Sequence, residues 1–366
     1  MKAQPDYSIY LVTDDGCLQG RALIDCVREA LHRLADHGIF GYTDAGKEYF
    51  APIRGWFQER FGWEPKQEWL ICTPGVVYGF SAAINALTQE GDAVLIQQPV
   101  YPPFAGALRE SGRILVNSPL HEENGVYRME PAEDMERRIV ENNVKVFLLC
   151  SPHNPVGRVW TRAELENVCA LARRYNVTII SDEIHADLEM PGYKVTPILS
   201  VEPNAIQLIS ATKTFNLAAL RHSSVLIKNA ELRARFKAEY DKRGIDGLNL
   251  FGALAQRTAY NEGEAWLDEL LAYIDSNRRV VEDALDGTVV KYSRLEATYL
   301  MWLDMRALNL NQKDLMRFVV EKARLGLNDG TSFGEEGAGF VRLNLATPRK
   351  NVVEAMARLT AALRTL

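Results

Sequence analysis

No run of apolar residues in this 366-residue sequence approaches the length of about 18 to 20 residues that a membrane-spanning helix needs. Long blocks of like charge are also absent: 42 basic and 48 acidic residues give a net charge of -6, which argues against a nucleic-acid-binding protein. Cysteine pairs with metal-ligand spacing are missing, so we expect no metal site. The odd number of cysteines indicates free thiols in a reducing compartment; they are Cys17, Cys26, Cys72, Cys150 and Cys169.

The opening stretch, MKAQPDYSIYLVTDD, has no basic segment followed by an apolar core, so no secretion signal is predicted and a cytoplasmic location is expected. Apolar residues make up 47% of the chain and charged residues 25%, which is typical of a globular protein. The length is sufficient for two domains, or for one large domain with a smaller companion.

Short apolar runs alternate with amphipathic segments from about residue 46 to 250. Each run is too short for a helix but suits a strand that is buried on both faces. One of the amphipathic segments begins with the capping box Thr161-Arg162-Ala163-Glu164. This alternation predicts a large α/β domain with a mainly parallel sheet covered on both sides. The predicted strands are residues 93–97, 113–117, 145–150, 177–181, 205–209 and 223–227.

The pattern changes after Gly263, where a long helix is followed by strands and helices in mixed order. We predict that residues 1–45 and 263–366 form a smaller α+β domain beside the large domain of residues 46–262. The elements predicted in this second part are a helix at 265–285, a strand at 297–303, a helix at 315–323, a strand at 339–345 and a helix at 352–363.

Four polar stretches lie where predicted strands end or a helix begins. Lys213 follows the strand at 205–209, Asp182 follows the strand at 177–181, HNPVG (153–157) follows the strand ending at Cys150, and PGVVYG (74–79) precedes an apolar helix. Each stretch also has an ordinary structural interpretation. Lys213 could be a loop residue, Asp182 a helix cap, HNPVG a turn, and PGVVYG a helix start that contains glycine. Together they predict a ligand site, because ligands of parallel sheets bind at the carboxyl ends of the strands.

The motifs HNPVG, SDEIH, SATKTFNLAALR and FVRLN, in this order, resemble those of fold-type I pyridoxal 5′-phosphate (PLP) enzymes, the aminotransferase class I/II superfamily. The resemblance covers residues 38 to 350, approximately. It implies an aspartate aminotransferase-like fold, in which the large domain holds a mainly parallel seven-stranded sheet. It also implies PLP as the cofactor.

By this resemblance, Lys213 is the catalytic lysine that holds the aldehyde of PLP, a role that requires a deprotonated amine. Asp182 faces the pyridine nitrogen and keeps it protonated, so that the ring can accept electrons. Asn154 donates to the phenolic oxygen, and Tyr101 stacks on the ring.

The phosphate group is expected at the start of the helix that follows Gly75, where backbone amides and the helix dipole favour an anion. Ser210 and Arg221 match the phosphate ligands of the superfamily, with Arg221 as a forked donor. The predicted cofactor-binding set is completed by Val76, Val77, Thr212 and His185.

Arg342 resembles the arginine that binds the α-carboxylate of the substrate, and Asn154 and Tyr101 are predicted to contact the substrate as well. Tyr42, in FGYTD, resembles the tyrosine that reaches the phosphate in the neighbouring subunit. The resemblance therefore implies a homodimer with shared active sites, acting on a small amino acid.

Within the superfamily, four stretches resemble those of cystathionine β-lyase-like carbon-sulfur lyases of the PatB and MalY type. The stretches are DEIH (182–185), CSPHNPVGRVW (150–160), HGIFGYT (37–43) and EATYL (296–300). The implied reaction is β-elimination from an S-substituted cysteine such as cystathionine, which yields a thiol, pyruvate and ammonia. Lys213 is expected to remove the Cα proton.

Two departures from the pattern affect the substrate prediction. Residues 10–17 replace the Trp-x-Ala-Asp-Met-Asp-Phe-like stretch that lines the substrate site in these lyases, and Ala219 stands where glycine is common. The sequence therefore leaves the substrate unidentified. It leaves three alternatives open: an aminotransferase using the same residues, a PLP-binding regulatory protein, and a scaffold without cofactor.

Overall fold

A computed structural model describes residues 24–244 and 248–365. Its central feature is a seven-stranded sheet in which β9 alone runs opposite to the other strands. The predicted mainly parallel sheet is confirmed, and each of the six predicted strands begins and ends within a residue of the observed one. In spatial order the strands are β1 (Leu70–Thr73), β9 (Ser223–Ile227), β8 (Ile206–Ile209), β7 (Thr178–Asp182), β6 (Val146–Cys150), β2 (Ala93–Ile96) and β3 (Ile114–Asn117).

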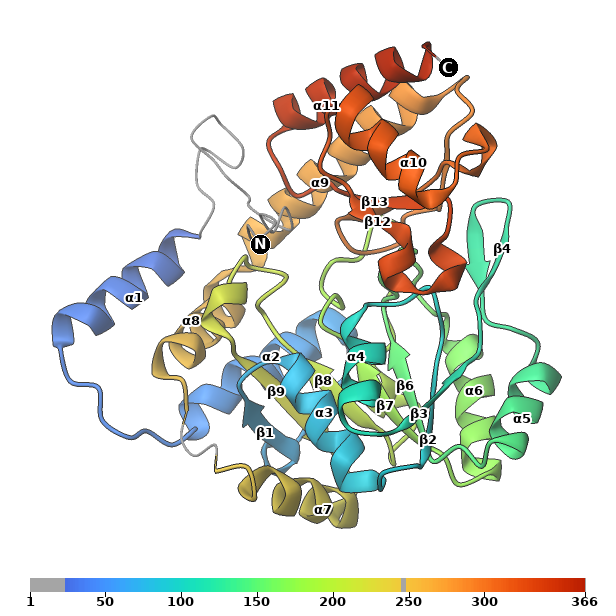
Figure 1. The fold of residues 1–366 in the computed structure, drawn as a ribbon. Coiled ribbons are helices and arrows are strands. Elements are labelled where there is room, and N and C mark those ends of the chain that lie inside the picture. The colour runs from blue at the N-terminus through green and yellow to red at the C-terminus, as the bar shows by residue number, and fades with distance from the viewer. Residues whose placement is uncertain (1–23, 245–247, 366) are drawn as a thin grey trace.

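Helices cover both faces of this sheet (Figure 1). Successive residues of a strand point to opposite faces, so in β6 Leu148 packs with Phe80 on one side while Leu149 packs with Trp160 on the other. Burial on both faces explains why the strands are continuous apolar runs. One face carries α3 (Val76–Leu87), α4 (Pro103–Glu110) and α7 (Ala230–Asp241); the other carries α2 (Lys47–Phe61), α5 (Ala132–Glu141), α6 (Arg162–Arg174) and α8 (Leu250–Glu262).

The start of α6 is the predicted capping box. The Thr161 side chain accepts a hydrogen bond from the Glu164 backbone N–H, and the Glu164 side chain accepts one from the Thr161 backbone N–H. These bonds satisfy donors that the helix itself leaves unpaired.

The C-terminal part of the chain forms a second, four-stranded antiparallel sheet with helices packed against it (Figure 1). The predicted strand at 297–303 begins later, at Leu300, because the Thr298 N–H donates instead to the carbonyl of Leu188 in the first part of the chain. The elements are α9 (Glu264–Leu285), β10 (Lys291–Tyr292), β11 (Leu300–Asp304), α10 (Gln312–Arg317), a π-helical turn (Phe318–Lys322), β12 (Asn328–Asp329), β13 (Phe340–Asn344) and α11 (Arg349–Leu363).

A small hairpin, β4 (His121–Glu123) and β5 (Val126–Arg128), lies beside the second sheet, and Arg294 donates its backbone N–H to the Gly125 carbonyl at the hairpin tip. At the other end of the molecule, α1 (Asp25–His37) packs against α8. The boundaries of the two predicted domains stay a prediction. None of the described helices is both long and apolar enough to cross a membrane.

Candidate active site

A cavity of about 700 Å³ lies at the carboxyl ends of β6, β7 and β8, between these strand ends and the second sheet. It brings together residues that are far apart in the sequence. The predicted site residues that line it are Gly75, Val76, Val77, Tyr101, Asn154, Asp182, His185, Thr212, Lys213, Arg221 and Arg342.

Asp182 is the last residue of β7 and is 4% exposed. Its Oδ1 accepts a hydrogen bond of 3.1 Å from the Ile184 backbone N–H. Burial raises the pKa of Asp182 to about 7, and both this hydrogen bond and the positive charge of Lys213 act in the opposite direction. A buried carboxyl that is costly to ionise is suited to a cationic partner, such as a protonated ring nitrogen.

Lys213 lies in the turn after β8 and its side chain is half-buried in the cavity wall. The residues before and after it are held by hydrogen bonds. Thr212 Oγ1 lies 2.7 Å from Ser210 Oγ, and Thr214 Oγ1 donates to Asp187 Oδ2 at 3.0 Å. The backbone that carries the amine is therefore fixed on both sides.

Ser210 itself is buried and is not among the residues that line the cavity. Its hydroxyl donates to the carbonyl of His222 at 2.6 Å and accepts from the Thr212 N–H at 3.1 Å. These bonds join the strand end of β8 to the residue before β9. Phosphate binding by Ser210 stays a prediction, whereas Thr212 lines the cavity directly.

The N-terminus of α3 forms one wall of the cavity. Gly75 has φ +123° and ψ 154°, a conformation that residues with a side chain essentially avoid, and a Cβ at this position would have no atom within 4 Å. Its N–H donates to Ser223 Oγ at 3.2 Å. The amides of Val76 and Val77 open the helix, and Arg221 lines the same cavity from the segment before β9. Helix N-terminus and guanidinium together suit a phosphate.

Asn154 and Arg342 meet across the cavity. The Asn154 side-chain oxygen accepts a hydrogen bond of 2.8 Å from Arg342 Nη1. Arg342 also donates through Nη2 to Asn328 Oδ1 at 2.9 Å, and its guanidinium lies 4.7 Å from the centre of the Phe333 ring. The arginine, which is 8% exposed, is thus held rigidly in a position where it can bind a carboxylate.

His185 is 3% exposed, and its Nδ1 has no hydrogen-bond partner among the described residues. Burial, reinforced by the charges of Lys213 and Arg342, lowers the pKa of His185 to about 3, so the ring is neutral. The ring packs edge-on against Tyr299, with 5.9 Å between centroids.

Several residues of the cavity wall were missed in the sequence. Tyr299 belongs to the quoted EATYL stretch, which carried the family resemblance but no predicted site residue. Most of the others also lie in quoted stretches, such as Tyr78 in PGVVYG and Ile184 in DEIH, but were not assigned to the site, because aromatic and apolar residues next to strands and helices are usually core residues. The wall residues that were missed are Pro74, Tyr78, Ser81, Cys150, Ile184, Ala218, His222, Tyr299 and Leu300.

Tyr42 does not line the cavity and is fully exposed. Its predicted contact with a neighbouring subunit therefore stays a prediction. Residues 10–17, on which the substrate prediction depends, lie outside the described residues.

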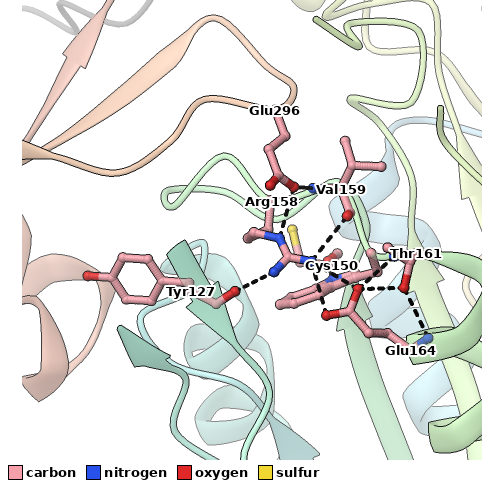
Figure 2. Close-up of polar contacts among 8 residues, drawn as sticks. Tyr127, Cys150, Arg158, Val159, Thr161, Glu164 and Glu296 are labelled. Atoms are coloured by element: carbon pink, nitrogen blue, oxygen red, sulfur yellow. Dashed lines mark hydrogen bonds and ion pairs between the residues drawn. The ribbon is translucent and has the colours of Figure 1, made fainter. Parts of the chain in front are cut away.

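Arg158 joins the turn after β6 to the segment that leads into β11 (Figure 2). Its Nε donates to Glu296 at 2.9 Å, Nη1 donates to the Tyr127 carbonyl at 2.6 Å, and Nη2 donates to Glu164 at 2.9 Å. Glu296 also accepts from the Val159 N–H at 2.9 Å. Three segments distant in the sequence are thereby fixed around the turn that presents Asn154.

The residues present fit PLP. The cavity offers an amine for the aldehyde, a buried carboxyl for the ring nitrogen, an amide side chain for the phenolic oxygen and a helix N-terminus with an arginine for the phosphate; these are supplied by Lys213, Asp182, Asn154, α3 and Arg221. Tyr101, half-buried in the wall, offers an aromatic face.

Comparison with known proteins gives consistent results. The family model described as aminotransferase class I and II matches residues 14–359. Cystathionine β-lyase PatB of Bacillus subtilis is 38% identical over 345 residues, which are 93% of this chain and 89% of PatB. The crystal structure of cystalysin from Treponema denticola, which contains PLP, superposes with a TM-score of 0.91 at 34% identity, covering 96% of this chain and 91% of cystalysin. The PLP-bound C–S lyase from Staphylococcus hominis superposes with a TM-score of 0.88 at 28% identity, covering 97% of this chain and 90% of the lyase.

Proposed function

The chain belongs to the aminotransferase class I and II family, and on that premise we propose that it is a PLP-dependent carbon-sulfur β-lyase. The proposed reaction converts an S-substituted cysteine, such as cystathionine, and water into a thiol, pyruvate and ammonia. The observation that carries the proposal is the convergence of Lys213, Asp182 and the Asn154–Arg342 pair on one cavity, in a chain whose relative PatB is named a cystathionine β-lyase.

When bound, PLP supplies an aldehyde that captures the substrate amine and a ring that withdraws electrons from the substrate Cα. Asp182 would accept a hydrogen bond from the protonated ring nitrogen of bound PLP, and the positive charge of that ring would stabilise the ionised carboxylate in its buried position. Arg221 and the N-terminus of α3 are proposed to hold the phosphate.

Arg342 binds the α-carboxylate of the substrate, and its hydrogen bond to Asn154 fixes the guanidinium relative to the cofactor site. This clamp orients the Cα–H bond toward the amine of Lys213. Lys213 removes that proton as general base. The electrons left on Cα expel the β-thiolate, and hydrolysis of the remaining carbon skeleton gives pyruvate and ammonia.

We propose a homodimer in the cytoplasm as the working form. The segment before α2 supports the homodimer, because it exposes apolar and aromatic side chains: Ile39 is 69% exposed, Phe40 is 57% exposed, and Tyr42 is fully exposed. Exposed apolar side chains in a row are typical of an interface. Tyr42 is the residue we propose to reach the phosphate in the partner's site.

An aminotransferase is the second candidate, since the matching family model carries that description and the same lysine, aspartate and arginine would serve in amino transfer.

The lyase and aminotransferase candidates are separated by incubating the purified, PLP-loaded protein with cystathionine, cystine, S-alkylcysteines and cysteine conjugates. We expect thiol and pyruvate in equal amounts from at least one of these, without added keto acid. Amino transfer that requires a keto acid, with no thiol released, would establish the aminotransferase instead. A purified protein without the yellow chromophore of PLP would contradict both candidates.

A further inference from the structure

Tyr299 lies in the cavity wall and is 3% exposed, yet among the described residues its hydroxyl has no hydrogen-bond partner. Buried polar groups are nearly always paired, and an unpaired one costs free energy unless a ligand or water completes it. A phenol hydroxyl at the wall of an active-site cavity is therefore a candidate for direct ligand contact.

The backbone around Tyr299 is held in a strained conformation. The preceding residue, Thr298, has φ +76°, which is rare for a β-branched residue, and it is completely buried. Its N–H donates to the Leu188 carbonyl at 2.8 Å, and its hydroxyl accepts from the Leu300 N–H at 3.0 Å. Strain of this kind is retained where the surrounding structure imposes it, most often at functional sites.

Tyr299 is also fixed on its other side. Its carbonyl accepts a hydrogen bond of 2.8 Å from the Leu345 N–H, just beyond β13, the strand that carries Arg342. Its ring packs edge-on against His185. The phenol is thus positioned by contacts on three sides, from the second sheet, from the strained turn and from the segment after β7.

The electrostatic surroundings of the phenol keep it a neutral donor. Burial raises the pKa of Tyr299, more than the positive charge of Arg342 lowers it. The hydroxyl therefore stays protonated at physiological pH, and its partner is a group that accepts. Tyr299 and Arg342 line the same cavity, so an anion bound by Arg342 lies in the cavity that Tyr299 borders.

We propose that the Tyr299 hydroxyl donates a hydrogen bond to the substrate α-carboxylate that Arg342 binds, and so helps to select amino acids over amines. A carboxylate offers about four acceptor positions, so a guanidinium and a phenol can be accommodated together. This inference rests on the proposed function in one respect, that the cavity binds PLP and an amino acid beside Arg342.

The test compares two ligands that differ only in the carboxylate: 2-aminoisobutyrate and isopropylamine. Neither carries a β-leaving group, so β-elimination from either is excluded; 2-aminoisobutyrate has no Cα proton, and any slow amino transfer from isopropylamine is avoided by reading its binding from the initial absorption change. Each is titrated into the PLP-loaded protein and followed by the change in cofactor absorption. We expect Tyr299→Phe to weaken 2-aminoisobutyrate binding about 10- to 100-fold, the range for a hydrogen bond to a charged group, and to leave isopropylamine binding unchanged.

Tyr78→Phe is the matched control, because Tyr78 also lines the cavity and its hydroxyl also has no partner among the described residues, but it stands on α3 at the proposed phosphate end. We expect Tyr78→Phe to leave the ratio of the two affinities unchanged. Three results for Tyr299→Phe would each overturn the proposal. The binding of both ligands could weaken equally, the binding of neither could weaken, or a loss of PLP affinity or thermal stability could account for the change.

The outcome is separable from that of the proposed function. If the unsubstituted protein releases thiol and pyruvate but Tyr299→Phe leaves the affinity ratio unchanged, the role of Tyr299 is wrong and the lyase proposal stands. If no S-substituted cysteine is cleaved but the affinity ratio falls as expected, the carboxylate contact stands and the lyase proposal is wrong.

Discussion

Arg342 on β13 donates a 2.8 Å hydrogen bond to the side chain of Asn154, although 188 residues separate the two in the sequence. Asn154 lies in the turn after β6 of the large sheet, and Arg342 in the antiparallel second sheet. The bond therefore links the proposed cofactor site to the proposed carboxylate site. Both partners are buried, so the bond is shielded from competing water.

Replacing the amine at the centre of the cavity tests the role of Lys213. Lys213→Ala is expected to abolish the bound-cofactor absorption band near neutral pH and to reduce β-elimination at least 10³-fold, because a general base and the attachment point are lost together. Lys242→Ala is the control, since Lys242 is exposed at the end of α7 and pairs with Glu239 at 3.6 Å. If Lys213→Ala kept both the absorption band and the turnover, Lys213 would be neither the attachment point of the cofactor nor the general base.

The raised pKa of Asp182, about 7 in the folded protein against 3.8 ordinarily, predicts a pH-dependent effect of Asp182→Asn. In the cofactor-free protein, the stability contributed by the protonated carboxyl is fully present below pH 3.8 and is lost as the pH rises through 7. The amide does not titrate. We therefore expect the stability of the variant, relative to the unsubstituted protein, to increase between pH 4 and 8, by about 2 to 4 kcal/mol.

With PLP bound, this trend should shrink or reverse, because the protonated ring nitrogen stabilises the Asp182 carboxylate. Thermal unfolding of both proteins, with and without PLP, over this pH range provides the measurement. The neighbouring buried Glu183 titrates in both proteins; burial raises its pKa and the Asp182 charge raises it further, so Asp182→Asn also lowers the pKa of Glu183, and this change adds to the measured difference. A pH-independent difference in the cofactor-free forms would contradict the predicted pKa shift.

The conformation of Gly75 predicts a backbone effect on cofactor binding. Because Gly75 has φ +123°, Gly75→Ala is expected to cost about 1 to 3 kcal/mol in backbone strain and to weaken PLP binding by displacing the amides at the start of α3. Gly46→Ala is the matched control: Gly46 precedes α2 with φ −74°, and a Cβ there also meets no atom within 4 Å. PLP titration and chemical unfolding measure the two effects, and equal behaviour of both variants would rule out the strain argument.

The buried position of Arg158 predicts a large loss of stability on its removal. Arg158→Met leaves the buried Glu296 carboxylate without its cationic partner, and breaking a buried ion pair in this way costs about 3 to 5 kcal/mol. The exposed helical pair of Arg358 and Glu354 serves as the control, because Arg358→Met should cost less than about 0.5 kcal/mol. Urea unfolding of the two variants gives the comparison; similar values would show that the Arg158 contacts contribute little.

The strands that carry the site could be predicted from the sequence with little error, because strands buried on both faces must be continuously apolar. The run Val146–Cys150 and the polar residues after it are an example. The strand Leu70–Thr73 was not predicted, since it is short and two of its four residues are only half-buried. The start of β11 was also placed too early, because Thr298 bonds to Leu188, a contact that no local pattern indicates.

The sequence by itself determined the chemical groups of the site: a lysine after one strand, an aspartate at the end of the next, and an asparagine in the turn after a third. The rule that ligands of parallel sheets bind at the carboxyl ends of the strands was enough to predict that these groups lie together. Only the tertiary structure decided that Ser210 bonds to Thr212 away from the cavity, that Asn154 bonds to Arg342, and that Tyr299 lines the cavity with a hydroxyl that has no partner in the part of the chain that the structure describes. The physical reason is that periodicity and turn chemistry act between neighbours in the chain, whereas burial and hydrogen-bond pairing depend on segments that meet only when the two sheets pack.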